Sequence, residues 1–218
     1  MSTIRTGAAA ARLVVESGAV YTRTGGEPFF FTSGWASPVF IDVKRLISLP
    51  EARGRLITLC LETLAETPGN DAFALVAGCE LAGVPFAAMI ADRLGKSLVV
   101  VRKQGKGFGR LAQFEGTFEP GERVLLVDDL ATDGVSKVGF RQALERAEAT
   151  VVETFVLLDY GIFPSTRRLL SLMSLADVIA AAEEAQVLDG RALDEVKAFA
   201  ADAPQWSRRN GGIASLAL

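Results

Sequence analysis

Short apolar runs alternate along this chain with longer stretches in which apolar residues recur at helical spacing. The runs are four to eight residues long and rich in branched side chains, and they predict buried strands at residues 72–77, 97–101, 124–127 and 151–158. The helical spacing predicts helices at residues 51–66, 85–94 and 138–146. Because strands and helices alternate, we expect an α/β fold with a doubly wound parallel sheet, in which ligands bind beyond the carboxyl ends of the strands.

Less regular segments flank this alternating region. Residues 3–18 predict a helix, residues 29–42 predict two short strands around a turn at Gly34, and residues 165–203 predict further helices. A chain of 218 residues fits one domain, or one domain with a small subdomain. We therefore expect a single domain over residues 1–218, with a hood contributed mainly by residues 1–48 and a poorly anchored tail at 204–218.

Composition and charge narrow the range of functions. Half of the residues are hydrophobic and 22% are charged, so the chain can bury a sizeable core and is not expected to be disordered. The net charge of −3 argues against a nucleic-acid partner, because such proteins neutralise phosphates with an excess of cations. No run of 18 apolar residues occurs and the segment from Met1 to Thr6 is polar, so we expect no membrane association and a cytoplasmic location.

Histidine is absent from the chain, and cysteine occurs twice, at Cys60 and Cys79. The lack of histidine excludes a Ser-His-Asp triad, imidazole metal ligands and a histidine general base. The two cysteines form neither a metal-binding pattern nor a disulfide framework. Catalysis must therefore rest on carboxylates, ammonium and guanidinium groups, backbone donors and bound metal.

A polar loop follows the strand predicted at residues 124–127. It begins with two carboxylates and continues with two hydroxyl groups and a glycine: Asp128, Asp129, Thr132, Gly134 and Ser136. Backbone N–H groups and the positive end of the next helix attract a phosphate, and Gly134 permits a positive φ and a close approach to a ligand. The paired carboxylates can accept two vicinal hydroxyl groups of a ribose or help to hold a hydrated Mg²⁺. The loop therefore predicts a site for a sugar that carries a phosphate.

Other nucleotide-binding motifs fit the sequence less well. A dinucleotide-binding fold requires G-x-G-x-x-G after its first strand, and no such match occurs. A P-loop requires lysine after its last glycine, whereas Gly83 is followed by Val84 and Pro85. Two acids at a strand end can also be a solvated strand terminus. The acids, threonine, glycine and serine within nine residues favour the ligand site.

Two more loops follow predicted strands. Residues 78–83 form a glycine-bounded turn between a strand and a helix, which is either an ordinary turn or a ligand loop. Residues 102–110 hold three glycines and four cations, with no acid before Glu115. Such a run is commonly a solvated face, but here it follows a sheet strand in a slightly acidic chain. We therefore expect a mobile lid that closes on polyphosphate.

The polar loop at residues 128–136 resembles the 5-phosphoribosyl-1-pyrophosphate motif of type I phosphoribosyltransferases. Ser37-Pro-x-Phe-x-Asp42 beside Lys44 is similar to the N-terminal segment of the orotate phosphoribosyltransferases, where the hood covers the pyrimidine. Residues 78–83 resemble that family's pyrophosphate loop, and Arg-Lys-x-x-Lys-x-x-Gly at residues 102–109 resembles its catalytic loop. The resemblance covers roughly residues 20–165, by motif rather than by overall identity.

The resemblance implies transfer of 5-phosphoribosyl from 5-phosphoribosyl-1-pyrophosphate to orotate in pyrimidine biosynthesis, giving orotidine 5′-monophosphate and pyrophosphate. It also implies a Mg²⁺ cofactor held mainly by the substrate, with Asp129 as the candidate protein ligand, and a homodimer with shared active sites. The catalytic residues that it implies are Arg102, Lys103, Lys106, Asp128 and Asp129. The substrate-binding residues that it implies are Phe40, Lys44, Gly78, Cys79, Glu80, Leu130, Ala131, Thr132, Asp133, Gly134, Val135, Ser136 and Tyr160.

The sequence departs from this family at two positions. Many members have histidine where this chain has Phe108, and many have arginine, which holds the orotate carboxylate, where it has Tyr160. The carboxylate can instead meet backbone N–H groups near Gly161 or the Tyr160 hydroxyl. Two alternatives therefore stay open, a phosphoribosyltransferase for another base and a non-catalytic regulator that binds the same ligand. The hood and lid motifs argue against the first alternative, and the retained lid cations argue against the second.

Overall fold

The computed structural model describes residues 2–105, 109–161 and 169–215, with side chains from Arg5 onward. Its centre is a six-stranded sheet in the order β10-β9-β8-β5-β6-β7, in which only β7 is antiparallel to its neighbour. The strands of this sheet are β5 (Leu75–Cys79), β6 (Ser97–Val101), β7 (Phe114–Glu115), β8 (Arg123–Ala131), β9 (Thr150–Asp159) and β10 (Leu170–Ser174). The predicted doubly wound parallel sheet is thus confirmed.

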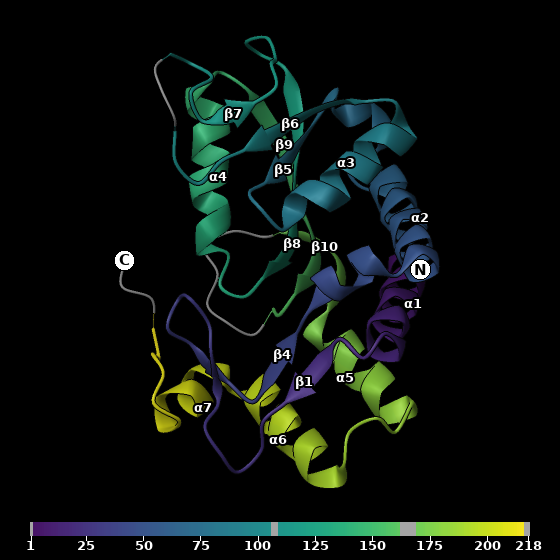
Figure 1. Ribbon diagram of the computed structural model, residues 1–218, viewed down its shortest axis with the longest axis vertical. Helices are drawn as coiled ribbons and strands as arrows, with labels where there is room; N and C mark the ends of the chain where they lie inside the picture. The colour runs from purple at the N-terminus through teal and green to yellow at the C-terminus, as the bar shows by residue number, and fades with distance from the viewer. Residues whose placement is uncertain (1, 106–108, 162–168, 216–218) are drawn as a thin grey trace.

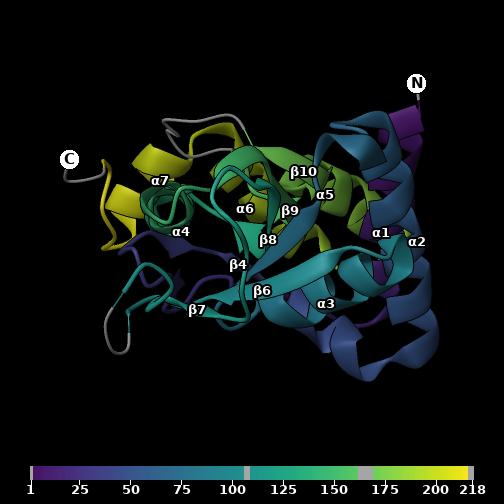
Figure 2. The same cartoon turned by 90° about the horizontal axis from the view of Figure 1, so that it is seen from above.

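Helices cover both faces of the sheet (Figures 1 and 2). They are α1 (Ser2–Glu16), α2 (Pro50–Glu66), α3 (Gly83–Leu94), α4 (Val135–Arg146), α5 (Leu175–Glu184), α6 (Gly190–Ala201) and α7 (Ala203–Arg209), with short 3₁₀ turns η1 (Val43–Ser48) and η2 (Asn70–Ala72). Among the described residues, none of these helices combines the length and the apolar character that crossing a membrane requires.

Alternation along β8 divides the core into two parts. Val124 and Leu126 belong to the cluster under α4, whereas Leu125 and Val127 belong to the cluster shared with α1, α2 and α3. This is the two-residue period of a strand that is buried on both faces. The same period decides to which face each residue after Val127 points.

β8 and β10 are among the elements that differ from the sequence-based prediction. β8 continues to Ala131 instead of ending at Val127, because its ladder with β9 extends to the pair Ala131 and Asp159. β10 is a strand within residues 165–203, where helices were predicted. Its leucines and methionine favour helices locally, but pairing with the edge of β9 outweighs that weak preference.

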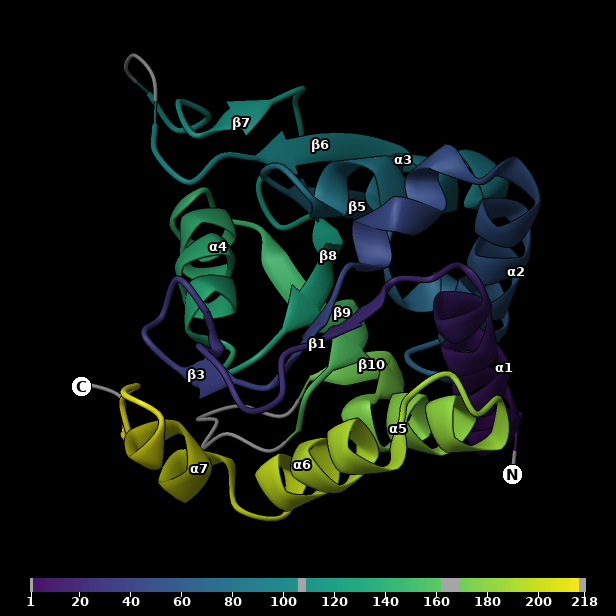
Figure 3. The ribbon, with the colours of Figure 1, turned by 60° about the horizontal axis from the view of Figure 1, so that its bottom comes forward.

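The hood is a pair of small antiparallel ladders beyond the carboxyl ends of the sheet strands (Figure 3). β1 (Val20–Thr22) pairs with β4 (Val39–Ile41), and β2 (Phe29–Phe30) pairs with β3 (Ala36–Ser37). Gly34 has a φ of +94° in the turn between β2 and β3, so the predicted hairpin is confirmed. Helix α1 packs against α2, α5 and β10, and the two ladders span residues 20–41, within the hood predicted at residues 1–48.

The C-terminal segment is anchored to the hood, so the prediction of a poorly anchored tail is wrong for residues 204–213. The side chain of Asp202 caps α7 by accepting a hydrogen bond from the Gln205 N–H, at 3.2 Å. In Figure 3, α7 lies beside β3. Proline just inside the start of α7, after an aspartate, is a helix-start pattern that the sequence carries.

Candidate functional site

The acidic pair lies inside the last part of β8 rather than after it, and both side chains are buried. Asp128 and Asp129 are 6% and 7% exposed. Successive side chains of a strand point to opposite faces, so Asp128 faces α4 and Asp129 faces the side of η1. Two lysines match this division. Lys137 of α4 pairs with Asp128 at 2.5 Å. Lys44 of η1 pairs with Asp42 at 3.0 Å and also lies 3.7 Å from Asp129.

Sequence reasoning missed Lys137, which is 7% exposed. Its Nζ donates to Asp128 Oδ2 and lies 3.2 Å from the Ser136 hydroxyl. A buried lysine without a partner is very costly, whereas this pair compensates both charges. One signal existed in the sequence. Lys137 lies three residues before Phe140 on the buried stripe of α4, where a lysine indicates a buried acidic partner.

The environment of Asp129 favours its protonated form. Burial, and then the neighbouring charge of Asp128, raise the pKa of Asp129 from 3.8 to about 6. The positive charges of Lys137 and Lys44 lower it in part. Asp129 is therefore a carboxylate that changes charge near neutral pH, a property typical of functional sites.

The loop after β8 has the conformation that the sequence predicted. Gly134 has a φ of +74° and a ψ of 0°, and it is the N-cap residue of α4. The N-terminus of α4 thus lies close to the end of β8, and the first N–H groups of a helix together with its dipole can bind an anion. The residues predicted around Gly134 belong to three elements: Leu130 and Ala131 end β8, Thr132 and Asp133 lie in the loop, and Val135 and Ser136 begin α4. Val135 and Ser136 are exposed, whereas Ala131 and Asp133 are buried.

The second loop, residues 78–83, packs tightly under β8. A Cβ added to Gly83 would lie 2.5 Å from the Val127 carbonyl oxygen and 2.9 Å from Asp128 Oδ1. Only glycine therefore lets the start of α3 approach the acidic pair so closely. Gly78 is similarly restricted by α3, because a Cβ added to it would lie 2.9 Å from the Ala87 Cβ. Cys79 is buried in β5, and burial, followed by the charge of Asp128, raises the pKa of its thiol.

Glu80 joins this second loop to the segment that the sequence predicts to be a lid. Its Oε2 accepts a hydrogen bond from the Lys103 backbone N–H at 2.7 Å, while the Lys103 side chain is exposed. Arg102 forms an ion pair with Glu115 at 2.5 Å, so in this arrangement its guanidinium is committed to β7. Lys106 and Phe108 lie outside the described residues.

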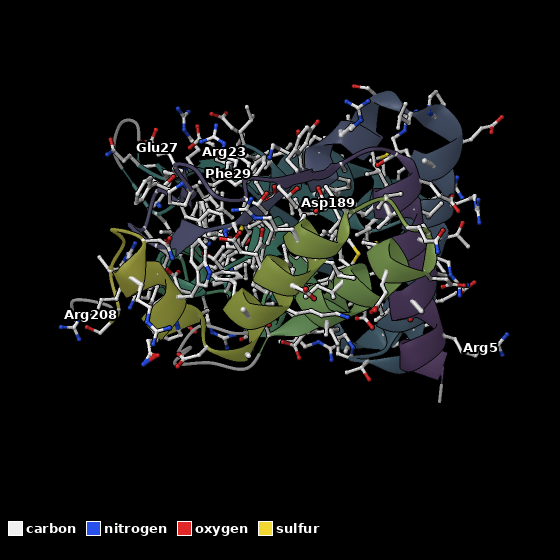
Figure 4. The ribbon with its side chains drawn as sticks, turned by 90° about the horizontal axis from the view of Figure 1, so that it is seen from below. Arg5, Arg23, Glu27, Phe29, Asp189 and Arg208 are labelled. Atoms are coloured by element: carbon white, nitrogen blue, oxygen red, sulfur yellow. The ribbon has the colours of Figure 1, made fainter. Side chains whose placement is uncertain are left out.

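A series of contacts connects the aromatic side chains of the hood to Asp129 of the acidic pair. The Phe29 and Phe40 ring centres are 5.8 Å apart, and the Arg23 guanidinium carbon lies 4.4 Å from the Phe29 centre. Figure 4 shows Arg23 and Phe29 close together. The Lys44 ammonium lies 5.8 Å from the Phe40 ring centre and 3.7 Å from Asp129. A ring, a cation and a carboxylate thus follow one another from the hood to β8.

Tyr160 is placed differently from the expectation that its hydroxyl receives a substrate carboxylate. The residue is 2% exposed, and its ring packs edge-on against Phe31 with 5.5 Å between the centres. Burial raises the pKa of its hydroxyl, and a backbone hydrogen bond at Ile41 opposes this rise. The Gly161 N–H donates to Asp159 Oδ1 at 3.0 Å. Both groups considered for the carboxylate therefore already have partners within the protein.

The described residues contain no cluster of three or more His, Cys, Asp or Glu side chains that could hold a metal by themselves. The Asp129 carboxylate is the kind of oxygen ligand that Mg²⁺ takes together with phosphate oxygens. The residues therefore fit a Mg²⁺ ion that a phosphorylated substrate holds and one carboxylate contacts.

Comparisons with known proteins agree with this geometry. Residues 51–167 match the family described as phosphoribosyl transferase domain. The chain is 42% identical over 215 residues to the orotate phosphoribosyltransferase of Rhizobium etli (strain CIAT 652), covering 95% of this chain and 93% of that one. It is 41% identical over 208 residues to the orotate phosphoribosyltransferase of Ruegeria sp. (strain TM1040), covering 92% of each chain.

Solved structures extend the comparison to the fold. The orotate phosphoribosyltransferase of Aeropyrum pernix superposes with a TM-score of 0.64 at 33% identity, covering 82% of this chain and 98% of that chain. The Leishmania donovani UMP synthase has a TM-score of 0.75 at 24% identity, covering 89% of this chain and 42% of that one, and it shows a shared fold. With a matching domain over more than half of its length and relatives above 40% identity, the chain belongs to the orotate phosphoribosyltransferase family.

Proposed function

We propose that this protein transfers the 5-phosphoribosyl group of 5-phosphoribosyl-1-pyrophosphate to orotate. The observation that carries the proposal is the pair of buried carboxylates at the end of β8, followed by the positive-φ Gly134 at the start of α4. This arrangement supplies acceptors for sugar hydroxyl groups and donors for a phosphate at one sheet edge. The names of the relatives supply the base, orotate.

The sugar and its 5′-phosphate are assigned to the loop after β8. The phosphate meets the N-terminus of α4, where backbone N–H groups and the helix dipole stabilise negative charge. Asp129 accepts hydrogen bonds from the ribose hydroxyl groups, and substrate binding displaces Lys44 from its 3.7 Å contact. Asp128, held by Lys137, is the second acceptor.

The reaction exchanges one bond at the anomeric carbon for another. The bond from that carbon to the pyrophosphate oxygen breaks, pyrophosphate leaves with the electron pair, and orotate N1 forms the new bond and loses its proton to solvent. Such displacements pass through an oxocarbenium-like state, so the site must stabilise the negative charge that develops on the leaving group. Mg²⁺, when bound, supplies Lewis-acid stabilisation of that charge.

The lid residues are assigned to the departing pyrophosphate. Lys103 has an exposed side chain and is fixed by its backbone N–H to Glu80, so its ammonium can swing toward the second loop. Arg102 must first leave Glu115 if it is to contribute. Lys106 is assigned the same role from its motif.

The base is assigned to the hood. Phe40 offers an aromatic face for the pyrimidine ring, and the Lys44 ammonium beside it can pair with the orotate carboxylate. This assignment replaces Tyr160 and the Gly161 N–H, which are engaged within the protein. We further propose a cytoplasmic homodimer in which the lid of one subunit serves the partner's site. The two cysteines are free thiols, as is usual in a reducing compartment.

The test follows orotate consumption by absorbance with 5-phosphoribosyl-1-pyrophosphate, with and without Mg²⁺, beside parallel reactions with uracil, adenine and hypoxanthine. We expect Mg²⁺-dependent turnover of orotate alone. Turnover of another base in preference to orotate would assign the site to that base. Binding of 5-phosphoribosyl-1-pyrophosphate without turnover of any base would indicate a regulator.

A further inference from the structure

Asp133 presents a physical problem within the loop assigned to the 5′-phosphate. It lies directly before Gly134 and is 6% exposed. A carboxylate there repels a bound phosphate, so hydrogen-bond donors are needed to offset its charge. Both of its oxygens have donors. Oδ1 accepts from the Val135 N–H at 3.0 Å, and Oδ2 accepts from the Trp35 indole N–H at 3.1 Å. Asp133 is therefore held between the first residue of α4 and the hood.

Trp35 is fully buried and is itself fixed by the C-terminal segment. The N–H of Ala36, the next residue, donates to the Ser207 hydroxyl at 3.0 Å, and that hydroxyl donates to the Ile213 carbonyl at 2.6 Å. The Ile213 N–H donates to the Gly34 carbonyl at 3.1 Å. Figure 3 shows the resulting stack, with α7 beside β3 and β3 next to the start of α4.

This contact leaves little room for adjustment. A Cβ added to Gly212 would lie 2.4 Å from the Ala36 nitrogen and 2.4 Å from the Ser207 hydroxyl oxygen. The turn that carries Trp35 therefore has one close-packed position against the C-terminal segment. Through the Trp35 indole, that position also sets where the Asp133 carboxylate lies.

We propose that Trp35 and Asp133 form a positioning pair that fixes the Gly134 turn for the 5′-phosphate and joins it to the hood that receives the base. The inference rests on the proposed function, adds Trp35 to it, and gives Asp133 a positioning role in place of the expected contact with the substrate. Asp133 acts through the Val135 N–H and the backbone of the loop rather than by touching the substrate. A shift of the hood moves Trp35, and Trp35 moves Asp133. Binding of the base at the hood is therefore coupled to binding of the 5′-phosphate at the Gly134 turn.

Two substitutions interrupt the link from Trp35 through Asp133 to the Val135 N–H from opposite ends. Trp35→Phe keeps an aromatic ring but removes the donor. Asp133→Asn keeps the shape, but its single amide oxygen can accept from only one of the two N–H groups. We expect each to raise the Kd for 5-phosphoribosyl-1-pyrophosphate about 10-fold, equivalent to about 1.4 kcal/mol, and to leave kcat at saturation within about 2-fold. The double variant should bind about as tightly as either single variant, because each substitution alone already interrupts the one link between Trp35 and the Val135 N–H.

Trp206→Phe is the matched control. It makes the same chemical change in α7, where Trp206 packs on Phe199 with 5.4 Å between the ring centres, and should leave the Kd unchanged. The chain has two tryptophans, so this variant also makes Trp35 the sole indole fluorophore. Its emission should shift when 5-phosphoribosyl-1-pyrophosphate binds, and Asp133→Asn in that background should remove most of the shift.

The outcomes separate this inference from the proposed function. If the unsubstituted protein fails to bind 5-phosphoribosyl-1-pyrophosphate, the proposed function is wrong. If it binds but Trp35→Phe and Asp133→Asn match the control, or if their effects multiply in the double variant, the positioning pair is refuted. The emission of Trp35 can be measured in the Trp206→Phe protein, in which both Trp35 and Asp133 are unsubstituted. An emission spectrum that stays the same at saturating 5-phosphoribosyl-1-pyrophosphate refutes the coupling even if Trp35→Phe does not fold.

Discussion

Replacing Asp129 with asparagine should make the protein more stable at neutral pH while removing activity. The folded protein raises the pKa of Asp129 from 3.8 to about 6, so it binds the proton more tightly than the unfolded chain does. The free energy of unfolding therefore falls as the pH rises from about 4 to about 6, and remains lower above that range. At about 1.4 kcal/mol for each tenfold change in proton affinity, the ionised carboxylate costs about 3 kcal/mol at pH 8.

Asparagine has nearly the same shape and cannot ionise, so Asp129→Asn should recover most of that energy at pH 8 and about half of it at pH 5. For a chain of this size, about 3 kcal/mol corresponds to a rise in Tm of about 6–12 °C. Urea unfolding at the two pH values measures the difference directly. Asp128→Asn is the matched control, and it should lose about 3–5 kcal/mol at pH 8, because Lys137 would be buried without its partner. A gain for Asp129→Asn that is equal at both pH values, or a loss at pH 8, would refute the reasoning.

Three further substitutions test other parts of the site. Gly83→Ala should cost about 1–3 kcal/mol of unfolding free energy in urea titrations, because the new Cβ meets the Val127 carbonyl; an unchanged midpoint contradicts the close approach. Gly134→Val should raise the Kd for 5-phosphoribosyl-1-pyrophosphate by at least about 10-fold in calorimetry, because a branched residue opposes the +74° φ. Wild-type affinity would place the phosphate elsewhere. Lys137→Met should move the acid limb of the pH profile of kcat/KM to higher pH, because the Lys137 charge lowers the pKa of Asp129. An acid limb at the same pH would mean that the ionisation of Asp129 does not control activity.

The parts of the fold that the sequence predicts well are those governed by local periodicity. The buried strands and the helices between them follow from apolar spacing, and the positive φ of Gly134 follows from the residue type and its place before a helix. The end of β8 was harder to predict. Asp128 and Asp129 are polar, and they belong to the strand only because β9 continues the ladder beside them.

The contacts that complete the site come from residues far apart in the chain. Trp35 and Asp133 are separated by 98 positions, and neither residue type predicts that the other is its hydrogen-bond partner. The anchoring of residues 204–213 likewise depends on Ser207 meeting the Ala36 N–H, a long-range contact without a local pattern. The motif makes the Tyr160 hydroxyl one of two candidates for the orotate carboxylate, beside the N–H groups near Gly161. Tyr160 is buried and its ring packs against Phe31, a long-range contact that the motif does not indicate.

The central claim is that the acidic pair of β8 and the loop after it bind a phosphoribosyl group for transfer to orotate. The most direct measurement is the amount of orotidine 5′-monophosphate and pyrophosphate formed from orotate, 5-phosphoribosyl-1-pyrophosphate and Mg²⁺, by chromatography and mass. The account predicts equal amounts of the two products from the unsubstituted protein and almost none from a variant with Asp128→Asn and Asp129→Asn, once its fold is verified. Pyrophosphate without the nucleotide, or equal products from the double variant, would contradict it.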